Sequence, residues 1–520
     1  MEKNKLLLIP FFVGIILLVY SWYLSYPLSI DSLGDFVFNH VSPLYWFSLP
    51  LLLASMYVMA ATFKNNSLKW IITIGLVTTI FSLSYFYYML PGSDSHYFRG
   101  LNEYLIGTKN LDPSKPIHRY FQWPSFFLLS DMATSVSGLG LANFEFLLYA
   151  IIGFLLATAL YVYASKAYKN GGFLAVPAFF IAMFYFLNYQ FVPFSLAFAL
   201  LFLLFMLETR QKSFSVMLTM LVLYTSISFV HAFIPLFFVL YLLIQCMLNR
   251  SKQYGRLFVL TLMIYLVVQI TQAPFSFAEN IRIVMTSLTE YSSIVEATLV
   301  PVSVPIDVVA QMFSRSVTIA TVMICFVGFI LLVIKRKMRD LDKAILLTGG
   351  VYSVFGILFY VLGSRAFPIV FIPISLGASY LLESRFRRYI NFLFLVLLIL
   401  FAFIPLHTSF IDSPIMFQTK EEYVTANFMI EKYNWNTYGT ILSHVSTYGY
   451  IFTQIPANPI YETDYSPRFP SSNIEDYDCI IYSIGLARNL LRKNVSEEQI
   501  LDRFNVIYHS GSFYVAKQNG

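Results

Sequence analysis

The sequence predicts a polytopic α-helical membrane protein that carries a small soluble α/β domain at its C-terminal end. Three observations lead to this prediction. The 520 residues are 58% hydrophobic and 12% charged, whereas a soluble domain is about 25% charged. Apolar segments of membrane-crossing length recur through residues 1–408, and the composition becomes polar and acidic in residues 409–520. This combination excludes an ordinary cytosolic enzyme.

Thirteen apolar segments approach the roughly 20 residues that a bilayer-crossing helix needs. They cover residues 6–25, 44–63, 70–90, 143–166, 173–190, 192–209, 214–230, 232–248, 256–272, 316–335, 344–362, 367–382 and 389–406. The first segment is longer than the apolar region of a signal peptide and is not followed by a clear cleavage site. We therefore expect it to be an uncleaved first span.

The distribution of Lys and Arg orients these spans. With the N-terminus inside, the inner loops hold 19 Lys and Arg residues, and the outer loops before residue 407 hold 7. Because cytoplasmic loops are enriched in Lys and Arg, we expect the N-terminus inside and the segment after the last span outside. All seven histidines then fall on the outer side, with three long segments, 91–142, 273–315 and 407–520. Chemistry is therefore expected on the extracytoplasmic face of the cell membrane.

The part after the last span predicts a separate fold. From residue 407 onward the chain holds 8 Lys and Arg against 12 Asp and Glu. We expect a helix at 420–433 and strands at 440–444, 478–483, 504–509 and 512–517. The last two strands flank a Ser-Gly turn, which is typical of a hairpin. Alternating helices and strands predict that residues 409–520 form a small extracytoplasmic α/β domain. Residues 1–408 then form the membrane domain with outer loops 91–142 and 273–315.

The first long outer segment contains an acidic residue in an unusual setting. A Pro-Gly-Ser-Asp turn ends at Asp94, and we expect a helix from Ser93 or Asp94 to about Ile106. His96 and Arg99 follow on this helix, where residues four or five apart lie on nearby faces. A carboxylate can act as a general base on an acceptor hydroxyl, and cations can stabilise a leaving phosphate.

Other interpretations of these residues stay open. Asp94 can be a helix N-cap without any catalytic role, since Asp is favoured there. Asp31, Asp35 and Asp131 are rival bases on the outer side. Arg99 can serve only as an anchor to lipid head groups.

Several short motifs resemble those of the polytopic GT-C glycosyltransferases, archaeal-type members related to the protein mannosyltransferase group. The motifs are Gly92-Ser93-Asp94-Ser95-His96-Tyr97, Gln122-Trp123-Pro124, Ser137-Gly138-Leu139, Val230-His231-Ala232-Phe233 and Gly363-Ser364-Arg365. A soluble α/β domain after the last span is also similar to many members. The resemblance covers most of the chain by pattern.

The resemblance implies a catalytic mechanism and a set of site residues. GT-C enzymes transfer a sugar from a polyprenyl-phosphate carrier to an acceptor outside the cytosol. Asp94 would then be the base or the group that orients the acceptor. By their charge and hydrogen-bonding capacity, we expect His96, Arg99, His118, Arg119, His231 and Arg365 to bind the substrates. The acidic loop of the family usually follows the first span and here follows the third, which an extra N-terminal hairpin would explain. The loop lacks a paired carboxylate, and the three cysteines have no metal-binding spacing. We therefore assign no cofactor and no metal ligands, and a divalent metal stays an open alternative without support from the sequence.

The function expected from the sequence is that of a multi-pass membrane glycosyltransferase. Because nucleotide sugars are cytosolic, an outer-face enzyme needs a lipid-anchored donor, and the acceptor is a glycan, a lipid or a protein. The basic residues form no dense stripe, so nucleic acid is not expected as a partner, whereas membrane lipids are. The alternative is a transporter or flippase of a lipid or glycan, although the spans hold few charges for ion coupling. A third possibility is a non-catalytic assembly protein whose outer domain binds a partner.

Overall fold

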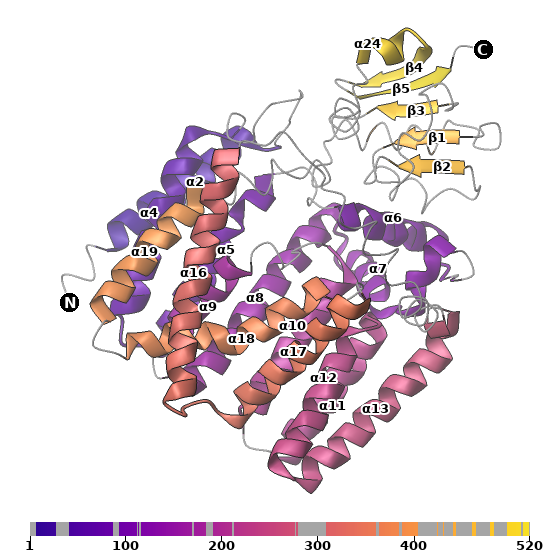
Figure 1. The fold of residues 1–520 in the computed structure, drawn as a ribbon. Helices are drawn as coiled ribbons and strands as arrows, with labels where there is room; N and C mark the ends of the chain where they lie inside the picture. The colour runs from indigo at the N-terminus through magenta and orange to yellow at the C-terminus, as the bar shows by residue number, and fades with distance from the viewer. Residues whose placement is uncertain are drawn as a thin grey trace.

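The computed structural model of the chain consists of a helical part and a separate C-terminal sheet (Figure 1). The residues that it describes are 7–27, 41–86, 93–111, 113, 116–168, 171–183, 191–210, 213–275, 277–278, 308–359, 363–383, 387–403, 424, 430, 440–443, 460–463, 479–482, 497–510 and 513–518.

Each of the thirteen apolar segments falls on a helix. These helices are α2 (Leu8–Ser25), α4 (Pro43–Thr62), α5 (Asn66–Ile80), α8 (Leu141–Ala167), α9 (Gly172–Ala182), α10 (Pro193–Glu208), α11 (Phe214–Val230), α12 (Ile234–Asn249), α13 (Lys252–Gln272), α16 (Val308–Ile334), α17 (Asp340–Phe359), α18 (Gly363–Leu382) and α19 (Arg387–Phe403). Two of them end well before the predicted spans do. The α5 helix ends at Ile80 and is followed by the 3₁₀ helix η1 (Ser82–Phe86), and α9 ends at Ala182.

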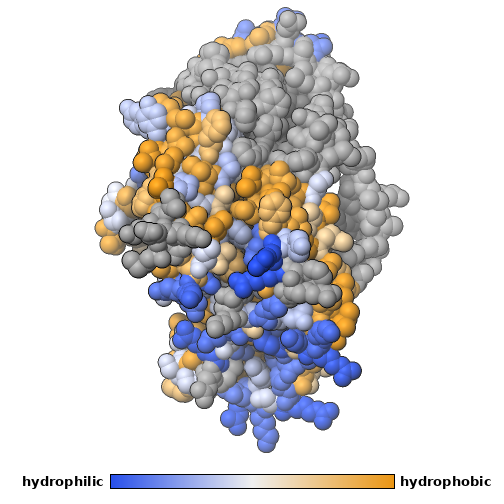
Figure 2. Space-filling view, turned by 90° about the vertical axis from the view of Figure 1, so that its left-hand side faces the viewer, coloured by the Kyte–Doolittle hydropathy of each residue, from blue (hydrophilic) through white to orange (hydrophobic). Residues whose placement is uncertain are grey.

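Length and composition indicate a helical membrane protein. Among the described residues, five helical segments are long and apolar enough to cross a bilayer, namely α2, α4, α8, α13 and Ser316–Ile334 within α16. Large apolar side chains project outward along them, and Ile16 and Met263 are 66% and 58% exposed. Contiguous exposed apolar surface of this kind is unusual in soluble monomers. Figure 2 shows hydrophobic side chains across the middle of one face and hydrophilic ones at its lower end. The count of thirteen spans and their orientation stay predictions.

Successive helices run up and down, so their ends meet at two opposite ends of the helical part. Ser379 Oγ, near the end of α18, donates to the carbonyl of Gly171, just before α9, at 2.6 Å. Tyr161 OH, near the end of α8, donates to the carbonyl of Asn66 in the first turn of α5 at 3.2 Å. We call the end where these contacts lie the basic end. Its exposed basic residues are Lys64, Lys166, Arg210, Arg250, Lys252, Arg256, Lys335, Arg336, Lys337, Lys343, Arg387 and Arg388.

Glycines allow some of these helices to approach closely. A Cβ added to Gly349 of α17 would lie 2.6 Å from Cγ2 and 2.8 Å from the backbone nitrogen of Val370 on α18. A Cβ added to Gly377 of α18 would lie 2.8 Å from the carbonyl carbon of Gly328 on α16. Small residues at helix crossings in membranes increase van der Waals contact between backbones. The α18 helix is therefore held against α16 and α17 by backbone packing.

Three further helical elements lie at the opposite end, which we call the α6 end. They are α6 (Ser93–Thr108), the 3₁₀ helix η2 (Pro116–Gln122) and α7 (Ser125–Ser137). The predicted helix from Ser93 or Asp94 is confirmed. It continues two residues past Ile106 to Thr108, and Lys109 follows with a φ of 54°. In Figure 1, α6 and α7 lie at the end of α8 that is remote from the α12–α13 turn.

The C-terminal part forms a five-stranded mixed sheet. Its strands are β1 (Thr440–Ser443), β2 (Ile460–Thr463), β3 (Cys479–Tyr482), β4 (Phe504–Ser510) and β5 (Phe513–Gln518), in the order β2-β1-β3-β5-β4. The β1 strand pairs in parallel with β2 and β3, whereas β5 pairs antiparallel with β3 and β4. Helix α24 (Glu497–Leu501) precedes the hairpin.

Four of these strands, and the hairpin, match the predicted ones, but β2 was missed. The β2 strand has four residues, Ile-Tyr-Glu-Thr, and so short a segment carries little periodicity. The predicted helix 420–433 lies outside the described residues except at 424 and 430. The side of the membrane on which the sheet lies stays a prediction.

Candidate functional site

One face of α6 is buried through polar side chains. Ser95, Arg99 and Asn102 follow a spacing of four and three residues, which places them on the same face of a helix, and all three are buried. Ser95 Oγ accepts a hydrogen bond at 3.0 Å from the backbone N–H of Phe191, just before α10. Asn102 Nδ2 donates to the carbonyl of Phe98 at 2.8 Å. The start of α6 is therefore attached to the start of α10.

Arg99 forms a buried ion pair with Glu145, in the second turn of α8. Arg99 Nε donates to Glu145 Oε1 at 2.6 Å, and Arg99 Nη2 contacts Glu145 Oε2. The two side chains are 1% and 0% exposed. An unpaired charge at such depth would be costly, so each residue holds the other in place. Glu145 was not predicted as the partner of Arg99, although a single carboxylate near the start of a long apolar segment indicates that a cation lies beside it.

The η2 helix brings His118 into an aromatic environment. His118 is buried, and its ring lies 4.4 Å from that of Tyr104 and 5.4 Å from that of Phe121. Arg119, the next residue, is half-buried. Trp123 follows and lies in a small buried cluster with Ala232 and Ala273. The segment of the Gln-Trp-Pro motif therefore contacts the junction between α11 and α12.

His231 ends α11 at this junction. Its Nδ1 accepts a hydrogen bond from the backbone N–H of Phe233 at 3.1 Å. A neutral imidazole in this arrangement carries its proton on Nε2. The ring is buried and lies 5.8 Å from that of Phe194 in the first turn of α10.

Segments far apart in the sequence therefore converge at the α6 end. Ser95 links α6 to the residues before α10, and the ring of Phe98 in α6 lies 4.8 Å from that of Tyr120 in η2. Trp123 then joins η2 to the α11–α12 junction, and Phe194 joins that junction back to α10. We call this set of residues, with His96, Arg99, His118 and His231, the α6 site.

The structure brings some of the predicted site residues together and does not describe the side chains of others. His96, Arg99, His118 and His231 are buried in the α6 site, and Arg119 lies beside it. Asp94 is in the first turn of α6 and Arg365 in that of α18, but the side chains of both lie outside what the structure describes. The catalytic and binding roles of all seven residues stay predictions.

The rival bases are placed only in part. Asp131 of α7 forms an ion pair with Lys109, whose Nζ lies 2.6 Å from Asp131 Oδ1. The lysine side chain is 58% exposed. This pair links the end of α6 to α7 and, as an exposed pair, contributes little to stability. Asp31 and Asp35 lie outside the described residues.

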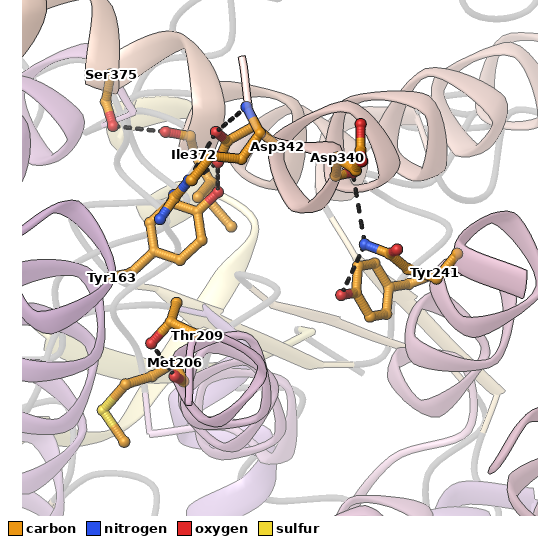
Figure 3. Close-up of polar contacts among 10 residues, drawn as sticks. Tyr163, Met206, Thr209, Tyr241, Asp340, Asp342, Ile372 and Ser375 are labelled. Atoms are coloured by element: carbon orange, nitrogen blue, oxygen red, sulfur yellow. Dashed lines mark hydrogen bonds and ion pairs between the residues drawn. The ribbon is translucent and has the colours of Figure 1, made fainter. Parts of the chain in front are cut away.

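The basic end carries a second buried polar network, part of which Figure 3 shows. Asp342 of α17 accepts hydrogen bonds from Tyr163 OH at the end of α8 and from Arg339 Nε and Nη2, the latter two at 2.9 and 2.8 Å. Burial disfavours the charge of Arg339, but its hydrogen bonds and charge interactions with Asp342 and Tyr163 together outweigh this effect, and the pKa of Arg339 lies above its ordinary value. This contact attaches α17 to α8.

The same network continues through three more helices. Gln245 of α12 donates to the carbonyl of Asp340 at 3.5 Å and to Tyr241 OH at 3.1 Å. Tyr241 in turn donates at 3.0 Å to the carboxylate of Glu208, at the end of α10, which also accepts from Tyr254 of α13 at 3.3 Å. Helices α8, α10, α12, α13 and α17 are thus tied together at the basic end.

Within the described residues, no group of three or more His, Cys, Asp and Glu side chains is arranged to hold a metal ion. The buried polar groups of the α6 site are instead histidine rings, the Arg99–Glu145 pair and amides. Such groups can bind and orient phosphate or sugar oxygens through hydrogen bonds.

Comparison with known proteins does not identify a family. No protein-family model matches the sequence, and no curated protein matches it. The function must therefore be inferred from the motifs and from the way the fold brings them together.

Proposed function

We propose that the protein is a multi-pass membrane glycosyltransferase of the GT-C type, which transfers a sugar from a polyprenyl-phosphate donor to an extracytoplasmic acceptor. One observation carries this proposal. Three of the motifs that resemble the GT-C family, around Ser95, Trp123 and His231, are far apart in the sequence but converge in the α6 site. A non-catalytic assembly protein has no need of that convergence.

In the proposed reaction, an acceptor oxygen attacks the anomeric carbon of the donor sugar. The Asp94 carboxylate takes the proton of the acceptor hydroxyl as the new C–O bond forms. The bond between the anomeric carbon and the phosphate oxygen breaks, and polyprenyl phosphate leaves with the electron pair. A single displacement of this kind inverts the anomeric configuration. Arg119 and Arg365 are proposed to bind the phosphate, and His96, His118 and His231 to bind phosphate or sugar oxygens.

The distribution of charge supports an extracytoplasmic α6 site. Among the described residues, twelve Lys and Arg are exposed at the basic end, against the two exposed acids Asp340 and Glu383. Because cytoplasmic loops are rich in Lys and Arg, we assign the basic end to the cytoplasm. The α6 site and the C-terminal sheet then lie outside.

The network at the basic end weighs against the transporter or flippase alternative. Alternating access requires each end of the helical part to open in turn. Opening the basic end would break the hydrogen bonds of Asp342, Gln245 and Glu208, which join five helices. Such buried bonds are costly to leave unmade. A membrane-embedded enzyme with access from one side needs no such opening.

The test is sugar turnover by the purified protein in lipid nanodiscs, with a panel of polyprenyl-phosphate sugars. Asp94→Asn removes the base but keeps the shape, and we expect turnover to fall about 10²- to 10⁴-fold, the contribution of a general base. Asp131→Asn is the matched control, because Asp131 lies in the same segment but is paired with Lys109 at the surface. Its turnover should stay within about threefold of wild type, because exposed pairs contribute little.

Two outcomes would contradict the proposal. Full turnover in Asp94→Asn would assign the base elsewhere, first to Asp31 or Asp35. The flippase alternative would be established if the protein turns over no donor and, when reconstituted in closed vesicles, moves a labelled polyprenyl-phosphate sugar across their membrane.

A further inference from the structure

We propose that Glu145 is a positioning residue, which holds the first turn of α6 in place through its ion pair with Arg99. The link to catalysis rests on the proposed function, because Asp94 lies in that turn. The claim that the ion pair fixes the position of α6 is separate from catalysis and can be tested without a substrate.

The contacts of α6 support this role. Arg99 lies one helical turn after Ser95, on the same face. Ser95 attaches the helix to the N–H of Phe191, and Arg99 attaches it to Glu145 of α8. Two polar attachments, one turn apart, join α6 to α8 and to the residue just before α10, and they fix both the position and the rotation of the start of α6. Asp94 immediately precedes the first of them.

The burial of the pair makes it sensitive to loss of one partner. Arg99 and Glu145 are 1% and 0% exposed. Removing one member of a buried pair leaves an unpaired charge, whereas removing both charges is often tolerated. With Glu145→Gln, the Arg99 guanidinium loses the carboxylate that joins it to α8, so this pair no longer holds the first turns of α6 against that helix.

The competing explanation is that Arg99 itself binds the donor phosphate. Both explanations predict that Glu145→Gln is harmful, since Glu145 orients Arg99 in either case. They differ for the double variant Arg99→Gln/Glu145→Gln. If the pair acts by holding α6, two amides that can hydrogen-bond with each other should restore much of the activity. If Arg99 binds phosphate, the double variant should stay as defective as Glu145→Gln or become worse.

The experiment measures hydrogen–deuterium exchange and steady-state turnover on the full-length protein in nanodiscs. In Glu145→Gln, we expect the amides of residues 95–105 to exchange about 100-fold faster and kcat to fall about 100-fold, with KM within about threefold. In the double variant, exchange and kcat should both return to within about tenfold of wild type. Asp342→Asn is the control, since it removes the carboxylate of a partly buried arginine pair at the basic end. It should lower thermal stability and leave the exchange of residues 95–105 unchanged.

The outcomes separate this inference from the proposed function. Unchanged exchange of residues 95–105 in Glu145→Gln would refute the hold on α6. Faster exchange with unrestored kcat in the double variant would refute the positioning role and assign phosphate binding to Arg99. Wild-type protein without turnover on any donor would refute the proposed function, while the exchange measurement would still decide whether Glu145 holds α6.

Discussion

The crossing of α17 and α18 offers a sharp test of the packing, because two adjacent glycines differ in their surroundings. A Cβ added to Gly349 would lie 2.6 Å from Val370 Cγ2, 2.8 Å from its backbone nitrogen and 3.2 Å from its Cα. A Cβ added to Gly350 would meet nothing within 4 Å. Gly349→Ala and Gly350→Ala therefore make the same chemical change in the same helix, with and without a clash.

The cost of the clash follows from these distances. Ordinary van der Waals contact begins at 3.4 Å, so the backbone of Val370 must retreat by 3.4 − 2.8 = 0.6 Å. A rotamer change cannot relieve a clash with a backbone atom, so α17 and α18 must separate along the crossing. Overpacking of this kind costs about 1–3 kcal/mol. Alanine in place of glycine gains about 0.5–1 kcal/mol in a helix, and both variants share that gain.

The assay is thermal unfolding in one detergent, followed by intrinsic tryptophan fluorescence. We expect Gly349→Ala to unfold about 2–12 °C below Gly350→Ala, at about 2–4 °C per kcal/mol. Gly350→Ala should unfold at or slightly above the wild-type temperature. Equal stability of Gly349→Ala and Gly350→Ala would refute the close approach of α17 and α18 at this crossing.

Two further predictions concern the basic end and its orientation. Tyr163→Phe removes one donor of the Asp342 carboxylate and leaves those of Arg339, and we expect a loss of about 0.5–1.5 kcal/mol in the free energy of unfolding, measured by the same assay. Tyr23→Phe, at an exposed tyrosine of α2, should have no effect, and equal stability of both variants would refute the role of the network. The orientation can be tested with single cysteines at Arg250 and Lys109, in a variant whose three native cysteines are replaced by serine. The two cysteines should differ in their reaction with a membrane-impermeant maleimide on intact cells. Lys109→Cys should react and Arg250→Cys only after the membrane is opened, and the reverse pattern would invert the assigned topology.

The helices could be predicted from the sequence because membrane-crossing length is a local property of the chain. A run such as Leu141–Ala167 is apolar regardless of its neighbours. The ends of helices were less predictable. The span was expected to reach residue 190, but helix α9 ends at Ala182. Because the residues that follow are also mostly apolar, the sequence did not indicate this end.

The partners in the α6 site could not be predicted, because they depend on packing between distant segments. Arg99 and Glu145 are 46 residues apart and lie on different helices. Trp123 and Ala232 are more distant still, and their contact has no local signature in the sequence. Short motifs nevertheless selected three of the segments that converge there, since each contains polar or aromatic residues at the end of an apolar run.

The network at the basic end also sets an order of events during synthesis. Glu208 meets both of its tyrosine partners within the next 46 residues. Tyr163 must wait for Asp342, which is made 179 residues later. At about 5–20 residues per second, the ribosome needs roughly 9–36 s to supply that partner. Tyr163 thus remains without this partner while the six described helices α9 to α13 and α16 are added. A nascent chain that stops before α17 therefore lacks the contact that attaches α17 to α8.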